Sequence, residues 1–206
     1  MALFFCKTDY AISCDKRIIQ VQPMALGYTP TGDFIVEPET TKMVESIAFR
    51  NAMCRLGAAV NVLTTDGEGG LAGLTASAVC SVTDGPPTLL ACINANARQY
   101  ERYIRNGVLC INVLHGSQED VSRRFSGAEA LSIEERFALT PWITLATGAP
   151  VLEDALLSFD CRISSVSRVG THGVFYCQVE QIRDSGQQES LLYFDRQYHR
   201  LTAAAA

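Results

Sequence analysis

The sequence predicts a mostly β domain that forms a closed or nearly closed barrel with short interspersed helices. Short apolar and β-branched runs recur along the chain, and turns rich in glycine and proline separate them. Long helices do not alternate with these runs, as they would in a doubly wound sheet. The 206 residues suffice for one sizeable core, so we predict a single domain over residues 43–206.

The first 42 residues differ from the rest of the chain. They carry scattered polar residues and several prolines, without a sustained helical or strand period: Pro23, Pro30 and Pro38. We predict that residues 1–42 form a poorly ordered N-terminal extension. Two origins stay open, a natural extension or an over-extended reading frame in which Met43 is the true start.

A helix and three strands are predicted to open the domain. Ser46 can cap the helix, and apolar residues recur at helical spacing until Gly57 ends it: Phe49, Ala52, Met53 and Leu56. Strands are predicted over residues 58–65, 73–83 and 88–94, because the intervening segments carry strong turn signals.

Short helices and further strands follow. Three capping signals each predict a short helix: Asn96, Ser117 with Asp120, and Ser132 with Glu135. The first of these helices is expected to end at Gly107 and the second near Gly127. A buried strand is predicted over residues 108–114, and alternation predicts half-buried strands over 157–164 and 175–179.

Charge and composition exclude several classes of protein. The formal net charge is −5, and no basic run is longer than Arg123-Arg124, which argues against a nucleic-acid partner. No apolar stretch is long enough to cross a bilayer, and the N-terminus lacks the features of a secretory signal. We therefore expect a cytoplasmic protein without a membrane partner.

The cysteines show no pattern typical of a metal centre. The chain has 8 cysteines without a CxxC spacing, and several lie inside apolar runs, such as Cys110. We interpret them as small buried hydrophobic residues in a reducing compartment. We expect neither a metal site nor a disulfide framework.

The segment 73–94 is the richest candidate for binding. Its small side chains leave the backbone approachable and supply short-range hydrogen-bond donors, as at Thr75, Ala76 and Ser77. A flat polar ring system with a phosphate tail needs such a surface. A plain solvent-facing pair of strands would explain the same composition.

This segment, together with Phe49-Arg-Asn-Ala-Met53 and Gly170-Thr171-His172, resembles the short-chain NADH:flavin reductase family of two-component flavin monooxygenases. The resemblance runs from about Phe49 to Leu201. Within that family the chain looks most similar to the flavin reductases of pyrimidine utilisation, through residues 58–67, 158–164 and 194–199. It is nearly as similar to the reductase component of 4-hydroxyphenylacetate 3-monooxygenase, through residues 92–96 and 134–137.

The resemblance implies an FMN-binding split β-barrel that works as a homodimer. It implies hydride transfer from NADH to FMN, with FAD as the other candidate flavin and NADPH as the other candidate donor. Reduced flavin would then diffuse to a separate monooxygenase of pyrimidine or aromatic catabolism. Two alternatives stay open: a split barrel with tightly bound flavin that acts as an oxidase, and a non-enzymatic module that binds flavin or haem.

The resemblance also assigns flavin contacts. Backbone groups of Thr75, Ala76 and Ser77 would lie along the isoalloxazine, where hydrogen bonds stabilise the charge of the reduced ring. Arg98, at or near a helix N-terminus, would suit the phosphate. The full implied set follows the chain: Thr75, Ala76, Ser77, Cys80, Ser81, Val82, Ile93, Asn94, Ala97, Arg98, Phe125, Ser126 and Gly127. Phe125 can equally be explained as a core aromatic residue, and Gly127 as the glycine that ends a helix.

A second group is implied on the nicotinamide side of the flavin: Gly170, Thr171, His172, Tyr198 and His199. His172 is the candidate catalytic residue, because its imidazole can donate a hydrogen bond to the dinucleotide. A solvent-exposed turn histidine is the alternative for His172, and strand-end packing is the alternative for Tyr198 and His199. We interpret His115 as structural. The sequence has no GxGxxG fingerprint, so a nicotinamide would bind without a Rossmann domain.

Overall fold

A computed structural model describes residues 27–28, 34–35, 44–128 and 130–203. The chain divides into two units, Met1–Val44 and Glu45–Ala206. In the first unit, β1 (Gly27–Tyr28) pairs antiparallel with β2 (Phe34–Ile35). Apart from these strands, the predicted poorly ordered extension over residues 1–42 lies outside the described residues.

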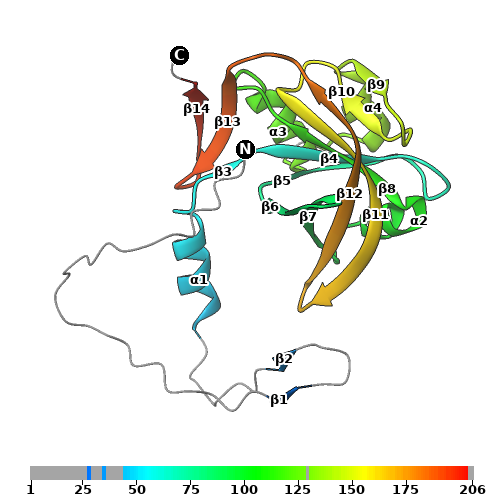
Figure 1. Ribbon diagram of the computed structural model, residues 1–206. Coiled ribbons are helices and arrows are strands. Elements are labelled where there is room, and N and C mark those ends of the chain that lie inside the picture. The colour runs from blue at the N-terminus through cyan, green and yellow to red at the C-terminus, as the bar shows by residue number, and fades with distance from the viewer. Residues whose placement is uncertain (1–26, 29–33, 36–43, 129, 204–206) are drawn as a thin grey trace. The chain divides into compact units, whose positions relative to one another are not determined.

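A seven-stranded antiparallel sheet dominates the second unit (Figure 1), in the order β5-β4-β8-β11-β12-β7-β6. Its strands are β4 (Asn61–Thr65), β5 (Ala72–Ala76), β6 (Val79–Asp84), β7 (Pro87–Asn94), β8 (Val108–Val113), β11 (Leu157–Val169) and β12 (His172–Asp184). The two end strands, β5 and β6, are separated in the chain only by Ser77 and Ala78. The backbone N–H of Cys92 on β7 donates to Ala78, 2.9 Å away. The sheet therefore curls until its ends meet at this corner, which confirms the predicted mostly β barrel.

Two small sheets complete the β structure. The first has the order β14-β13-β3, from β3 (Ala58–Ala59), β13 (Glu189–Phe194) and β14 (Gln197–Thr202). The second pairs β9 (Trp142–Thr144) with β10 (Pro150–Leu152). The helices are short: α1 (Ser46–Met53), α2 (Tyr100–Asn106), α3 (Glu119–Phe125) and α4 (Ile133–Ala138). None of these helices, in the described part of the chain, is long and apolar enough to cross a membrane.

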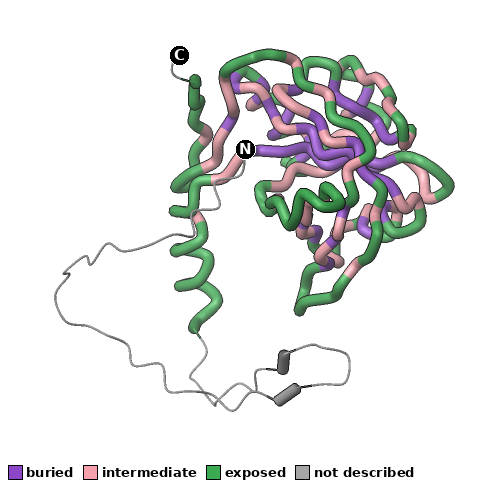
Figure 2. Tube along the Cα trace, in the orientation of Figure 1, coloured by how far each residue is buried: buried purple, intermediate pink, exposed green. Residues whose placement is uncertain are grey.

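The core lies on both faces of β4, all of whose residues are buried (Figure 2). On one face Leu63 packs with Tyr103 and Phe175 inside the barrel. On the other face Val62 packs with Phe125 beneath α3 and α4. Because β4 is buried on both faces, its polar side chains need partners inside the protein, and the Thr65 hydroxyl donates to the Val108 carbonyl at 2.7 Å.

Two predicted strands are each divided in the structure. The strand predicted over residues 73–83 becomes β5 and β6, because the chain turns at Ser77 and Ala78 from one end of the sheet order to the other. The strand predicted over residues 58–65 becomes β3 and β4. The break falls at Val60, whose N–H donates to Leu191 at 2.9 Å.

Helix starts also differ from the prediction. The helix assigned to Asn96 begins at Tyr100, and the N–H of Asn96 instead donates to the Asn94 side chain at 2.9 Å. The residues at the N-cap positions of α1 and α3 are Glu45 and Gln118, not Ser46 and Ser117. The capping box of Ser132 and Glu135 is confirmed, with both reciprocal hydrogen bonds present.

Candidate functional site

The candidate site lies along the free edge of β5. Only β4 pairs with β5, so the opposite edge of β5 carries backbone groups without a strand partner. On this edge the N–H of Gly73 donates to the Gln99 side chain at 2.9 Å. Because N–H directions alternate along a strand, the N–H of Thr75 points out of the same edge. The backbone N–H of Thr75 is therefore available to a ligand.

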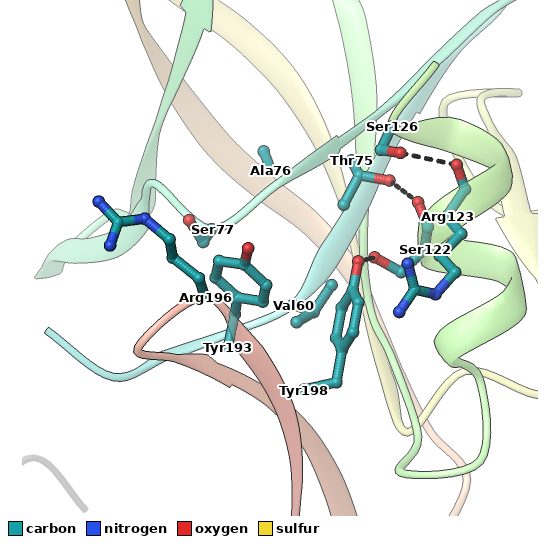
Figure 3. A pocket seen from close by; sticks show the side chains of 10 residues that line it. All are labelled: Val60, Thr75, Ala76, Ser77, Ser122, Arg123, Ser126, Tyr193, Arg196 and Tyr198. Carbon is teal, nitrogen blue, oxygen red and sulfur yellow. Dashed lines mark hydrogen bonds between the residues drawn. The ribbon is translucent and has the colours of Figure 1, made fainter. Parts of the chain in front are cut away.

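A pocket of about 410 Å³ borders this edge (Figure 3). Residues from β5, α3 and the β13–β14 hairpin surround it, with Val60 between them. Its lining residues are Val60, Thr75, Ala76, Ser77, Ser122, Arg123, Ser126, Tyr193, Arg196 and Tyr198. We call it the β5 pocket.

Hydrogen bonds hold the walls of the β5 pocket together. The Thr75 hydroxyl donates to the Ser122 carbonyl at 2.6 Å, which ties β5 to α3. The Ser122 and Tyr198 hydroxyls are 2.9 Å apart, which ties α3 to β14. Tyr193 meets Tyr198 edge to face, with ring centroids 5.2 Å apart. The pocket is thus bounded by fixed aromatic and hydroxyl groups that suit a flat polar ring.

The charges on the lining of the β5 pocket are positive. Arg123 lies 5.1 Å from the centre of the Tyr198 ring and pairs with Glu119 at 2.6 Å. The hydrogen bond and charge of Glu119 raise the pKa of Arg123. Arg196 donates instead to the amide oxygen of Asn51, 2.7 Å away. No carboxylate belongs to the described residues that line the pocket.

A second pocket, of about 800 Å³, continues along β5. Three arginines line it, Arg98, Arg102 and Arg136, and no carboxylate does among its described residues. The complete lining is Gly73, Leu74, Ala97, Arg98, Gln99, Arg102, Phe125, Ser126, Gly127, Ala130, Leu131, Ser132, Ile133 and Arg136. We call it the arginine pocket. It is suited to an anion.

The two pockets are adjacent along β5, and we call them together the groove. Ser126 lines both, and Gly73 and Leu74 of the arginine pocket precede Thr75 of the β5 pocket. Close packing holds β5 against this wall, since a Cβ at Gly73 would lie 2.7 Å from the Phe125 ring. The linings of the two adjacent pockets suit a ligand with a flat ring at one end and a phosphate at the other.

The groove brings together nine of the residues that the sequence singled out: Thr75, Ala76, Ser77, Ala97, Arg98, Phe125, Ser126, Gly127 and Tyr198. Phe125 is also buried in the core, as the core alternative expected, and its contact with flavin stays a prediction. Most of the remaining lining residues were not predicted from the sequence. Arg123, Arg196 and the tyrosine partner Tyr193 come from elements whose proximity depends on the fold.

The other predicted residues do not line the groove. Cys80, Ser81 and Val82 lie exposed on β6. The Ile93 side chain is buried in the core, so only its backbone can meet a ligand. His199 on β14 is exposed.

The residues around His172 form a separate group. Gly170 and Thr171 make the turn between β11 and β12, and His172 lies opposite Asn94 on β7. The Thr171 hydroxyl is 2.9 Å from Nδ1 of His172. The side chain of His172 is exposed, and it lines neither pocket of the described chain.

The described residues contain no group of three or more His, Cys, Asp or Glu side chains that could hold a metal ion. The cysteines among them are free thiols. Burial raises the pKa of Cys177 to about 12, and it also raises the pKa values of Cys110 and Cys161.

The structure is thus a small barrel of curled antiparallel sheet, with two adjacent pockets along its free edge. The sequence matches the family described as "Flavin reductase like domain" over residues 53–202. The chain belongs to this family, as the sequence resemblance predicted.

Curated relatives and solved structures agree with this membership. The chain is 51% identical over 163 residues to "FMN reductase (NADH) RutF" of Pantoea ananatis, an alignment that covers 79% of this chain and 85% of that protein. A structure from Haemophilus somnus, described as a flavin reductase, is 49% identical with a TM-score of 0.74, and covers 77% of this chain and all of that one. The styrene monooxygenase flavin reductase of Pseudomonas putida is 25% identical with a TM-score of 0.67, covering 76% of this chain and 99% of that one.

Proposed function

We propose that this chain is an NADH:FMN oxidoreductase that transfers a hydride from NADH to FMN. The observation that carries the proposal is the groove along β5, with aromatic and hydroxyl walls at one end and three arginines at the other. FMN has the matching form, a flat polar ring with a phosphate tail. The name of the Pantoea ananatis relative, an FMN reductase that uses NADH, supports this choice of substrates.

The residues fit FMN in one direction along the groove. The ring would lie in the β5 pocket, with the outward N–H of Thr75 available to its polar edge. The phosphate would lie in the arginine pocket near Arg98, where no described carboxylate opposes it. Bound flavin supplies the ring nitrogen that accepts the hydride.

The protein would act by orientation and electrostatics. The Ser122–Tyr198 and Thr75–Ser122 hydrogen bonds hold the walls of the β5 pocket in place. A fixed N–H at Thr75 would stabilise the negative charge that the ring gains on reduction. His172 would bind the nicotinamide dinucleotide, as the resemblance implies. No acid, base or nucleophile is needed for direct hydride transfer between stacked rings.

Reduced FMN would leave by diffusion for a separate monooxygenase in the cytoplasm. Both pockets open to solvent at exposed residues such as Arg98 and Arg196, which suits exchange of the flavin. The name of the Pseudomonas putida structure, a styrene monooxygenase flavin reductase, supports such a partner. Pyrimidine catabolism is the pathway we propose, because the sequence looks most similar to the flavin reductases of pyrimidine utilisation.

The chain would work as a homodimer. Helix α1 has no buried residue, and its apolar side chains are largely exposed: Ile47 is 62% exposed and Phe49 is 59% exposed. An amphipathic helix with so much exposed apolar surface is suited to cover by a second copy. Light scattering should give twice the chain mass at micromolar concentration, and a monomer there would contradict the dimer.

Consumption of NADH with added FMN, FAD or riboflavin tests the proposed function, with NADPH in parallel. Loss of NADH absorbance in proportion to added FMN is the expected result. A yellow protein that turns over without added flavin would favour an oxidase with tightly bound flavin. Flavin binding without NADH consumption would favour a binding module.

A further inference from the structure

The turn between β13 and β14 places an arginine in the left-handed region of the backbone. Phe194 pairs with Gln197, so Asp195 and Arg196 alone form the turn. Their φ angles are 47° and 63°. Two-residue turns of this hand favour asparagine and glycine, because a side chain is strained there. Arg196 therefore places a long charged side chain at a position where glycine would adopt the backbone conformation without strain.

The turn presents Arg196 to the β5 pocket. Arg196 lines this pocket, and Figure 3 shows it on the side of Ser77. Contacts with the end of α1 fix the turn: the N–H of Asp195 donates to the Cys54 carbonyl at 2.6 Å, and the Arg196 guanidinium donates to Asn51 at 2.7 Å. The guanidinium is thus held at the pocket wall instead of moving freely in solvent.

The charge of Arg196 lacks the compensation that other arginines nearby have. Arg123 pairs with Glu119, and Arg200 on the same hairpin pairs with Glu189 at 3.8 Å. None of the ion pairs between described residues includes Arg196, whose hydrogen-bond partner is a neutral amide. The remaining N–H groups of the guanidinium are therefore available to an anion, which they can meet in a bidentate way.

The position of Arg196 indicates which anion this is. The β5 pocket meets the arginine pocket at Ser126, and Figure 3 shows Ser126 and Arg196 on opposite sides of the β5 pocket. A flavin phosphate near Arg98 would therefore lie beyond the far side of the ring from Arg196. An anion at Arg196 belongs to a second ligand that enters over the β13–β14 hairpin.

We propose that Arg196 binds the diphosphate of the nicotinamide dinucleotide and so sets the affinity for the hydride donor. This inference rests on the proposed function. Arg196 is a binding residue here, which acts on the phosphates of the donor and not on its nicotinamide ring. It follows that a donor without phosphate does not use Arg196.

Steady-state kinetics of Arg196→Gln with two donors test the proposal. One donor is NADH, and the other is 1-benzyl-1,4-dihydronicotinamide, which carries the reacting ring without a phosphate. At saturating FMN, the variant should raise KM for NADH about tenfold or more, the size expected for loss of a charged hydrogen bond. Its kcat/KM for the phosphate-free donor and its KM for FMN should equal those of the wild type.

Three further variants separate binding from folding. Arg196→Gly should fold, because glycine adopts the turn without strain, and it should show the same rise in KM for NADH. Arg196→Lys keeps the charge and should recover part of the affinity. Arg200→Gln is the matched control on the same hairpin, outside the pocket lining, and should leave KM for NADH unchanged.

Each other outcome has a definite meaning. An unchanged KM for NADH in Arg196→Gln and Arg196→Gly would overturn the inference while leaving the proposed function intact. A raised KM for FMN in place of NADH would assign Arg196 to the flavin. Equal falls in kcat/KM with both donors would show that Arg196 has a structural role. A wild-type protein that binds flavin but does not oxidise NADH would overturn the proposed function and this inference with it.

Discussion

The hydroxyls of Tyr198 and Ser122 lie 2.9 Å apart and join the C-terminal hairpin to helix α3. These residues are 76 positions apart in the chain, and both line the β5 pocket. Thr75 extends the link, because its hydroxyl donates to the Ser122 carbonyl. Three segments thus meet at one short chain of hydrogen bonds, and the shape of the pocket depends on it.

Tyr198→Phe should lower the free energy of unfolding by about 0.5–1.5 kcal/mol, because it leaves Ser122 without this partner. KM for FMN should rise as the pocket wall loosens. Urea denaturation and steady-state kinetics measure the two effects. Tyr176→Phe is the matched control, since no described group bonds to its hydroxyl, and a Tyr198→Phe protein that matches this control would contradict the role of the link.

Arg98→Gln should weaken binding of FMN more than binding of riboflavin. The reason is that Arg98 lines the arginine pocket, where we place the phosphate that riboflavin lacks. KM for FMN should rise about tenfold, while KM for riboflavin should change little. Arg105→Gln, in the last turn of α2 and outside both pockets, provides the control. Equal rises in KM for FMN and for riboflavin would contradict the placement of the phosphate in this pocket.

Much of the fold follows from local sequence, whereas the pairing of distant segments does not. The capping box at Ser132 and Glu135 is a contact between near neighbours, so its sequence pattern predicts it directly. The break at Ser77 and Ala78 has no glycine or proline to mark it. It arises because barrel closure sends β5 and β6 to opposite ends of the sheet order.

The same difference applies to the site. Resemblance locates the stretch from Thr75 to Ser77 and the loop with Arg98, because both are local motifs. Arg196 lies in the similar stretch 194–199, but nothing in that stretch indicates a role for it, and the Asp195-Arg196 pair is an unusual choice for a two-residue turn. Its place in the pocket depends on hairpin register and on contacts with α1, which a single sequence does not reveal.

His172→Ala should impair use of NADH more than binding of FMN. The exposed imidazole lies beside the Thr171 hydroxyl and outside the groove lining, so its loss should leave the flavin pockets intact. KM for NADH should rise about threefold to tenfold, the range for one hydrogen bond. His115→Ala serves as the control, because His115 contacts Ser117 in a turn before α3. Unchanged NADH kinetics in His172→Ala would leave this histidine as a turn residue.

The buried thiols should resist alkylation in the native protein. Burial raises the pKa of Cys177 to about 12 from its ordinary value of 9.0, so the reactive thiolate is scarce at pH 8 and the side chain is inaccessible. Exposed Cys80 should react with iodoacetamide, and Cys110, Cys161 and Cys177 should react only after unfolding. Mass spectrometry of the peptides distinguishes them. Rapid native labelling of Cys177 would contradict its burial.

Alkaline pH should destabilise the protein for the same reason. An unfolded thiol ionises near pH 9.0, while folded Cys177 keeps its proton to about pH 12. The unfolded state therefore binds fewer protons in this range, and the free energy of unfolding falls as pH rises above about 9. Cys177→Ala should show a smaller fall in urea denaturation between these pH values. An identical pH dependence in the two proteins would exclude Cys177 as its source.

A crystal structure of the protein soaked with FMN would show whether the groove along β5 is the flavin site. We predict that the isoalloxazine lies in the β5 pocket, with a hydrogen bond from the N–H of Thr75, and that the phosphate lies among the arginines that include Arg98. Flavin bound on the exposed strand of Cys80, Ser81 and Val82, with the groove empty, would contradict it.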